Sequence, residues 1–584
     1  MAARKSDLRL PNECWESIFK FLLINYAGDG DAEHRCLESL SLVCKQFLSI
    51  TNHLRFSLTI CNPTLPFLPH LFQRFPNLTS LNLTRFKGDL DALLTKISTF
   101  PLRLKSLNLS NQSTIPANGL RAFAKKITSL ISLTCSNIHK IRTYDLVLIS
   151  DCFPLLEELD LSNPTKVNIE QNSKFFVLPK LRKVNLSGHY YINDSLFFNL
   201  CKNCEFLEEI VMLECRLLSQ DGVAFGIRQR PGLRSLSFRL RSSHDSSQLI
   251  DSLVSLKGLT YLDLTCSFMI DKSLLAIAKN GLPLRRLVLE DSLGGYSCVG
   301  HINLVSKCRF LQYLDLGNAD FFNDGDVCEL SRFLCDLVSI KISKGAHLTN
   351  LALFALLRNC PKLNEVRMEN TSIGKMSVKY PSNVYPHLKS LCLARNIWLG
   401  DEDVNMYASV FPNLQLLDLS FINGISEESI GQVLRKCSKI RHLNLAHCSG
   451  LSLPKMKFKV PMLEMLQLSY TNIDDETLHM ISKSCFGLLQ LDLSYCHDVT
   501  EKGVMQVIEN CTQLREINLY DCCKVSAVAV DSMVFMRPSL RKITTPPGFC
   551  CSDSKRKLLL RHGCLVCYYV GNELLKFDLS KVLE

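Results

Sequence analysis

Two groups of side chains in this 584-residue chain have types and spacings that could support chemistry. Near the end, Cys564-x-x-Cys567 follows the pair Cys550-Cys551, and thiols at such spacing are typical ligands of structural zinc. Carboxylates also recur along the chain, and a pair of them can serve as general acid and general base. These recurring residues include Asp263, Asp315, Asp418 and Asp492. Whether either group forms a metal or catalytic site depends on the helices, strands and loops that position its side chains.

A repeated apolar pattern predicts those elements. Its unit is an apolar residue, two variable residues, an apolar residue, one variable residue and a third apolar residue, as in Leu78-Thr-Ser-Leu81-Asn-Leu83. A period of 23 to 27 residues indicates leucine-rich repeats, each of which buries its apolar face against its neighbours. The nineteen copies begin at positions 78, 104, 130, 156, 181, 207, 233, 259, 284, 311, 337, 363, 388, 414, 440, 463, 488, 514 and 540.

Each repeat is predicted to begin with a short strand whose fourth and sixth residues point inward. A loop and a helix follow, and apolar residues on one helical face lead to a terminal cysteine, as in Leu478, Ile481 and Cys485. Because helices are wider than the spacing of strands, stacking predicts a horseshoe with a concave parallel sheet and convex helices. The predicted fold class is therefore an α/β solenoid, and the repeats resemble the cysteine-containing class of leucine-rich repeats.

The repeat gives a simpler interpretation of both chemical groups. The recurring aspartates all stand at the fifth position of a repeat, which favours a scaffold role over acid catalysis. Many of the 27 cysteines also keep fixed repeat positions, which is typical of small buried hydrophobes rather than disulfides. The cluster near Cys564 and Cys567 falls where the array must end, so we expect a capping segment there. No metal site, cofactor or catalytic residue is predicted, and a reducing compartment, cytoplasm or nucleus, is expected.

Charge and hydropathy argue against two classes of partner. The net charge is +11, but no block of lysine or arginine stands out, so we expect no nucleic-acid partner. No run of 18 apolar residues occurs, and the first ten residues lack the apolar core of a secretory signal, so no membrane association is expected.

Residues 8–52 do not follow the repeat and form a predicted helical head. Their pattern is Leu10-Pro11-x-Glu13, then Ile18-Phe19-x-x-Leu22, then Leu40-Ser-Leu42-Val43-Cys44-Lys45-x-Phe47. Proline suits the first turn of a helix, and the apolar residues exceed what so small a head can bury, which suggests a partner. This segment resembles an F-box, and the whole chain resembles the F-box/leucine-rich-repeat proteins of plant type.

The resemblance implies that the head docks on a Skp-type adaptor, which joins it to cullin and RING subunits of a ubiquitin ligase. The residues that it places in docking or in forming the head are Leu10, Pro11, Ile18, Phe19, Leu22, Leu40, Leu42 and Val43. A simpler alternative is that the head only caps the solenoid. We expect the head at 8–52, a degenerate first repeat at 53–77, the solenoid at 78–545 and a C-terminal cap at 546–584.

The concave face is predicted to carry the third, fifth and seventh residue of each repeat. Most are small or neutral, but Arg239, Arg286, Lys341 and Arg367 form a candidate surface for a protein substrate or an anionic ligand. A mixed-charge solvated surface is the other interpretation, because Glu290, Glu365 and Glu369 lie among them. The exposed apolar residues Val211, Leu213, Leu416 and Met465 are a second candidate.

The sequence thus favours a non-enzymatic substrate-recognition subunit of a Skp–cullin–F-box ubiquitin ligase with an unknown protein substrate. One alternative is a receptor of the same family gated by a hormone or an inositol phosphate, although the uniform repeat spacing leaves no long inserted loops. The other is a leucine-rich scaffold unconnected to ubiquitin.

Overall fold

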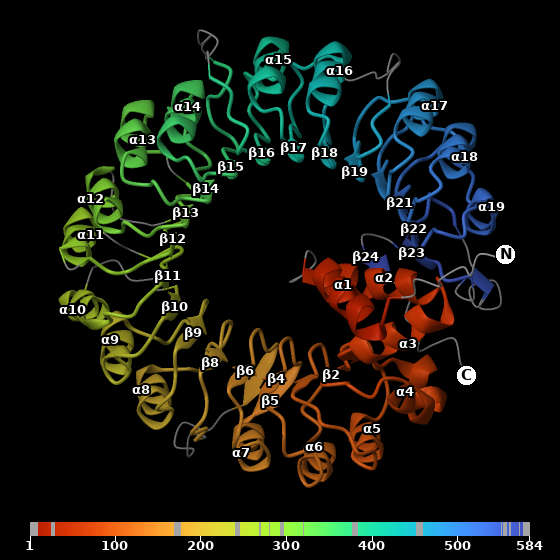
Figure 1. Ribbon diagram of the computed structural model, residues 1–584. Helices are drawn as coiled ribbons and strands as arrows, with labels where there is room; N and C mark the ends of the chain where they lie inside the picture. Colours follow the sequence, from red (N-terminus) through yellow and green to blue (C-terminus); the bar gives the residue numbers. More distant parts are fainter. Residues whose placement is uncertain are drawn as a thin grey trace, which may run out of the picture. The chain divides into compact units, whose positions relative to one another are not determined.

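The computed structural model describes residues 10–24, 30–168, 177–239, 246–267, 270–279, 281–291, 297–318, 320–375, 383–450, 459–549, 552, 558–559, 562–570 and 573–575. The chain divides into two compact units, which adjoin in sequence at Leu218 and Ser219. Within each unit, short parallel strands line the inner side of an arc and the helices of the repeats, from α4 onward, line its outer side (Figure 1).

The first unit begins with three helices and continues as a parallel sheet in the order β1-β2-β3-β4-β6-β8-β9. Strands β5 and β7 form a separate parallel pair. The elements are α1 Asn12–Ile24, α2 Gly30–Ser41, α3 Lys45–Leu54, β1 Ser57–Thr59, the 3₁₀ helix η1 Asn62–Phe67, α4 Leu68–Arg74, β2 Ser80–Asn82, α5 Leu90–Ile97, β3 Ser106–Asn108, α6 Ala117–Ala124, β4 Ser132–Thr134, β5 Lys140–Arg142, α7 Thr143–Cys152, β6 Glu158–Asp160, β7 Lys166–Asn168, β8 Lys183–Asn185, α8 Asp194–Asn203 and β9 Glu209–Met212.

In the second unit the strands β10 to β23 pair in parallel in chain order, and β24 pairs antiparallel with β23. The elements are α9 Gln220–Arg228, β10 Ser235–Phe238, α10 Ser247–Ser255, β11 Tyr261–Asp263, α11 Asp271–Ala278, β12 Arg286–Val288, α12 Val299–Lys307, β13 Tyr313–Asp315, α13 Asp324–Ser331, β14 Ser339–Lys341, α14 Asn350–Asn359, β15 Glu365–Arg367, β16 Ser390–Cys392, α15 Asp401–Val410, β17 Leu416–Asp418, α16 Glu427–Lys436, β18 His442–Asn444, β19 Met465–Gln467, α17 Asp475–Ser484, β20 Gln490–Asp492, α18 Glu501–Asn510, β21 Glu516–Asn518, α19 Ala529–Met536, β22 Lys542–Thr544, β23 Leu565–Val570 and β24 Glu573–Leu575.

The repeat fixes the register of the sheet. Fourth-position residues of neighbouring repeats face each other, as in Leu81 with Leu107 and Leu417 with Leu443. These leucines are buried, whereas the third and fifth positions beside them are half-exposed on the inner face, as alternation along a strand requires. The predicted fold class, an α/β leucine-rich-repeat solenoid with a small helical head, is confirmed.

The fifth-position aspartates have a backbone role. The Oδ1 atoms of Asp418 and Asp492 accept hydrogen bonds from the backbone N–H groups of Ser420 and Ser494, two residues further on, at 2.9 Å in both cases. Asparagine makes the same contact in other repeats, for example Asn108 with Ser110. The side chain thus closes the turn that ends each strand. The predicted scaffold role is confirmed.

The cysteines at fixed positions also serve the fold. The thiols of Cys448 and Cys522 are buried and donate to the backbone carbonyls of Leu419 and Leu493 in the preceding repeat, at 3.2 and 3.0 Å. Burial raises the pKa of Cys448 to about 11 and that of Cys522 to about 12. Such thiols stay protonated at neutral pH and pack as small hydrophobes.

Neighbouring helices are joined by an aspartate in the first turn. Asp475 at the start of α17 accepts hydrogen bonds from the backbone N–H and the hydroxyl of Thr500, the residue that caps α18. A β-carbon built on Gly503 would stand 2.3 Å from Oδ1 of the same aspartate. The close approach of these helices therefore requires glycine at this position.

Candidate functional site

The helical head has an aromatic core. Phe19 of α1, Leu37 of α2 and Ile50 and Leu54 of α3 are buried together, with Trp15, Leu23, Leu40 and Phe47 packed against them. The rings of Phe19 and Phe47 meet edge to face with centroids 4.9 Å apart. The side-chain amide of Gln46 donates to Oδ1 of Asn12 at 2.9 Å, which ties the start of α1 to α3. The core therefore fixes which apolar residues face outward.

The outward face of this head is apolar. Ile18, Phe21 and Leu22 follow one another at helical spacing on α1 and are exposed, Phe21 by 68%. Leu42 and Val43, in the turn before α3, are exposed by 79% and 64%. Leu10 and Pro11 at the start of α1 are exposed as well. We call the set Leu10, Ile18, Phe21, Leu22, Leu42 and Val43 the head face. Exposed apolar residues gathered in one small element are typical of an interface.

The resemblance left open whether each residue that it names docks or forms the head, and two of these residues lie in the head core. Phe19 is 1% exposed and Leu40 packs against the core, so both form the head rather than its outer surface. Conversely, Phe21 was not singled out from the sequence although it is strongly exposed. Its three-residue spacing from Ile18 was the signal that could have found it.

The basic residues predicted on the concave face are already engaged by neighbours. The Arg286 guanidinium lies over the ring of Tyr313, 4.1 Å from its centroid, and near Tyr261 at 5.3 Å. Arg367 pairs with Glu365 at 3.0 Å and approaches Glu369 at 4.0 Å. Arg239 directly follows β10 and is partly buried. This arrangement is a mixed-charge surface, not an open cluster of cations.

Lys341 is the most tightly held of these cations. Its Nζ lies 3.3 Å from Oδ2 of Asp315, on the neighbouring strand β13, and 2.7 Å from Oε1 of Glu290, which follows β12 two repeats before it. Burial acts to lower the pKa of Lys341, but the hydrogen bond of Glu290 and the charges of Asp315 and Glu290 outweigh it and raise the pKa above its ordinary value. An anionic ligand would have to displace these carboxylates.

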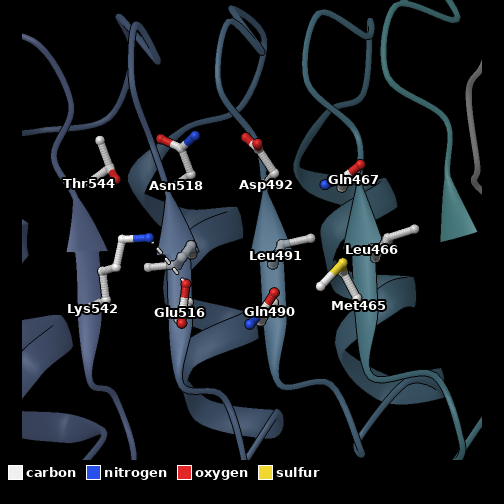
Figure 2. A pocket seen from close by; sticks show the side chains of 11 residues that line it. Met465, Leu466, Gln467, Gln490, Leu491, Asp492, Glu516, Asn518, Lys542 and Thr544 are labelled. Carbon is white, nitrogen blue, oxygen red and sulfur yellow. Dashed lines mark hydrogen bonds and ion pairs between the residues drawn. The ribbon is translucent and has the colours of Figure 1, made fainter. Parts of the chain in front are cut away.

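A hollow crosses the last repeats of the second unit. Figure 2 shows its side chains in two rows across the strands, with Lys542 reaching toward Glu516, whose Oε2 lies 3.2 Å from its Nζ. The third positions form one row, Met465, Gln490, Glu516 and Lys542, and the fifth positions the other, Gln467, Asp492, Asn518 and Thr544. The volume is about 140 Å³, below the roughly 300–1,000 Å³ of small-molecule sites. Its open polar rows suit a protein surface better.

The first unit carries two larger hollows. One, about 330 Å³, crosses β4 to β9, where Nζ of Lys183 lies 3.5 Å from a carboxylate oxygen of both Glu158 and Glu209. The other is mainly apolar, about 850 Å³, and lies between the start of the repeats and α4, with Phe56, Phe72 and Phe100 in its wall. The size of the second hollow falls within the range of small-molecule sites.

The predicted C-terminal cap is described only in part. Cys564 and Cys567 are buried, and β23, which contains Cys567, pairs with β22 and extends the parallel sheet. Burial raises the pKa of Cys564 to about 12, which disfavours the thiolate that zinc needs. Cys550 and Cys551 lie outside the described residues. Among the described helices, none has the length and apolar character needed to cross a bilayer.

Comparisons with known proteins find F-box relatives of parts of this chain. No family model matches the chain. F-box/LRR-repeat protein 4 of Bos taurus is 24% identical over 226 residues, 38% of this chain and 28% of that protein. F-box protein SKIP1 of Arabidopsis thaliana is 32% identical over 82 residues, 14% of this chain and 27% of that protein.

The chain is similar to F-box/leucine-rich-repeat proteins. It spans between a quarter and a third of the length of these F-box relatives. They come from an animal and a plant, so the plant-type detail stays a prediction. A solved structure, the TLR13–ssRNA13 complex, matches with a TM-score of 0.47 and 16% identity over 82% of this chain and 79% of that chain.

Proposed function

We propose that this chain is the substrate-recognition subunit of a Skp–cullin–F-box ubiquitin ligase. The head face binds a Skp-type adaptor, and the inner strand faces of the repeats bind a protein substrate. The chain performs no bond chemistry in this role; it supplies proximity and orientation to the conjugating enzyme that the RING subunit recruits.

The observation that carries the proposal is the head face. Helices α1 to α3 complete their core with Phe19, Leu37, Ile50 and Leu54, and still leave six apolar residues exposed. Exposing Leu42 and Val43 to water costs about 1.5–3 kcal/mol per side chain relative to burial, which a partner recovers on binding. The F-box relatives support the nature of that partner.

The inner faces suit protein substrates better than small anions. Arg286, Lys341 and Arg367 are covered by aromatic rings or paired with carboxylates. The hollow of Figure 2 instead offers rows of amides and carboxylates, which can exchange hydrogen bonds with an extended peptide. We place the substrate surface there in preference to the predicted basic residues.

The test is capture of a Skp-type adaptor by the purified full-length chain. The Leu42→Asp, Val43→Asp double variant should lose capture, because two carboxylates would be buried without partners at the interface. The matched control is Val528→Asp, since Val528 is 77% exposed on the second unit. Capture that survives in the double variant, with the control unchanged, contradicts the proposal and favours a scaffold unconnected to ubiquitin.

A second candidate function is a receptor gated by an apolar small molecule, and the hollow of about 850 Å³ beside Phe56, Phe72 and Phe100 favours it. Native mass spectrometry of the full chain purified from cells should then show a retained compound. Phe100→Ala should abolish retention while adaptor capture persists. A mass equal to that of the bare chain argues against this second function.

A further inference from the structure

Three side chains with metal-binding atoms lie together in the second unit. His497, Asp521 and Cys523 each offer one such atom, and these atoms all lie within 4.8 Å of one another. His497 and Cys523 are exposed, and Asp521 is half-exposed. An incoming ion therefore needs no opening of the core to reach them.

The repeat explains why the three residues meet. Strands β20 and β21 pair so that Leu491 faces Ile517, an offset of 26 residues. His497 and Cys523 are separated by the same offset, so they occupy the tenth position of consecutive repeats, and adjacent strands are about 4.8 Å apart. Asp521 reaches the same point from the eighth position, where its φ of 57° turns the chain. The pairing of the two backbones therefore brings these residues together, and the cluster does not depend on a chance contact between long side chains.

The donor set fits zinc. Imidazole nitrogen, thiolate sulfur and carboxylate oxygen are its usual ligands, at about 2.0–2.1, 2.3 and 2.0–2.2 Å. Tetrahedral geometry with these lengths separates sulfur and oxygen by about 3.5 Å. Sγ of Cys523 lies 3.9 Å from Oδ1 of Asp521, so a shift of a few tenths of an ångström completes that edge.

The repeat itself does not require these residues. The buried thiol that fills the turn is Cys522, bonded to Leu493, whereas Cys523 beside it is exposed. Nearby, Lys524 pairs with Asp498 at 2.7 Å, so the closest cation in sequence to Asp521 is engaged elsewhere. The tenth positions of the other repeats mostly hold other types, such as Lys87, Tyr190 and Ile397, although His139 also stands at one of them. Histidine and cysteine stand at consecutive tenth positions only here.

We propose that His497, Asp521 and Cys523 bind a zinc ion through three protein ligands, leaving one coordination position for water or for a side chain of a bound protein. Binding replaces the thiol proton of Cys523, which passes to solvent, and the ion keeps its oxidation state. His497 binds as the neutral imidazole, so acid opposes binding. The sequence alone did not indicate this site, because His497 lies 26 residues before Cys523 and becomes its neighbour only through stacking.

Cobalt(II) is the probe, because a cobalt–thiolate bond gives a charge-transfer absorption that zinc then abolishes. We expect one cobalt per full-length chain, displaced by one zinc. Cys523→Ser should remove the charge-transfer band. His497→Gln should weaken zinc binding by more than the 10- to 100-fold that losing an outer-shell partner costs. All ligands are at the surface, so thermal stability of the metal-free variants should be unchanged.

The matched control carries serine in place of the other exposed cysteines that the structure describes, Cys14, Cys44 and Cys335, and keeps Cys523. It should bind cobalt as the parent chain does. The proposal is overturned if the band persists in Cys523→Ser, if it vanishes in the control, or if His497→Gln binds zinc as tightly as the parent. None of these readouts involves the adaptor, so the proposed function can fail independently.

Discussion

The rings of Tyr470 and Tyr495 stack face to face, with centroids 3.9 Å apart and planes inclined by 17°. Both residues occupy the eighth position of a repeat with positive φ, 56° and 60°, a region that bulky side chains rarely adopt. Earlier repeats place asparagine there, as in Asn111 and Asn137, whose side-chain amides bond at 3.2 Å. Ring stacking thus replaces an amide ladder and offsets the backbone strain.

The stack continues from Tyr470 through His447 to Phe421. Truncating Tyr470, which stacks on a ring on each side, should therefore lower the stability of the protein. Tyr470 stacks on His447 at 4.1 Å and on Tyr495. Two aromatic pairs at about 0.5–1.5 kcal/mol each predict that Tyr470→Ala lowers the free energy of unfolding by about 1–3 kcal/mol. Tyr470→Phe keeps the aromatic ring and both of its stacking contacts, so it should change the free energy of unfolding by less than half as much. Equal losses in the two variants, measured by denaturant unfolding, contradict the stacking argument.

Phe19 and Phe21 are two residues apart and should respond to truncation in opposite ways. Phe19→Ala leaves a cavity in the head core and should lower stability by about 3–5 kcal/mol, monitored by hydrogen exchange of α1 and α3. Phe21→Ala removes an exposed ring, so stability should hold while adaptor affinity falls. The assignment of Phe21 to the head face is wrong if adaptor affinity is unchanged.

Glycine at the contact between α17 and α18 should be irreplaceable. A β-carbon at Gly503 would meet Asp475, so Gly503→Ala should lower stability by about 1–3 kcal/mol through overpacking. Gly431 in α16 provides the matched control, because nothing lies within 4 Å of a β-carbon built there. Gly431→Ala should raise stability by about 0.5–1 kcal/mol through the better helix propensity of alanine. Thermal melting of both variants decides the matter, and similar melting temperatures would argue against the close contact.

A buried histidine should make the first unit sensitive to acid. Burial lowers the pKa of His189 from 6.5 to about 4, while its bond to the Leu161 carbonyl and the charge of Asp160 act weakly the other way. Between pH 6.5 and 4 the unfolded chain therefore binds more protons than the folded one, and stability falls as the pH falls. At pH 5 the loss from this residue is about 2 kcal/mol relative to pH 7, and it levels off below pH 4.

His189→Gln cannot bind that proton, so its stability should change less between pH 7 and pH 5 than that of the parent chain. Urea unfolding at the two pH values measures the difference. Replacing the ring also removes packing and a hydrogen bond, so the diagnostic quantity is the change with pH and not the stability at either pH. Parallel pH dependence in the two chains would falsify the assignment of a depressed pKa to His189.

The repeated part of the chain could be predicted because each residue's role follows from its place in the period. Fourth-position leucines such as Leu81 and Leu417 are buried, and fifth-position aspartates such as Asp492 close turns. Cysteines such as Cys522 fill the interior. A periodic chain has one register that buries every leucine, so pattern alone determines strand pairing.

Only the tertiary structure shows which side chains contact each other across adjacent strands. The sequence shows Arg286 and Lys341 as spaced cations, but stacking places Tyr313 beside Arg286 and the carboxylate of Glu290, two repeats away, beside Lys341. The same stacking brings His497 to Cys523, 26 residues away in sequence. Adjacent strands are about 4.8 Å apart, so a contact between side chains of neighbouring repeats depends on which two residues face each other and on their rotamers. The repeat pattern in the sequence specifies neither the pairing of these side chains nor their rotamers.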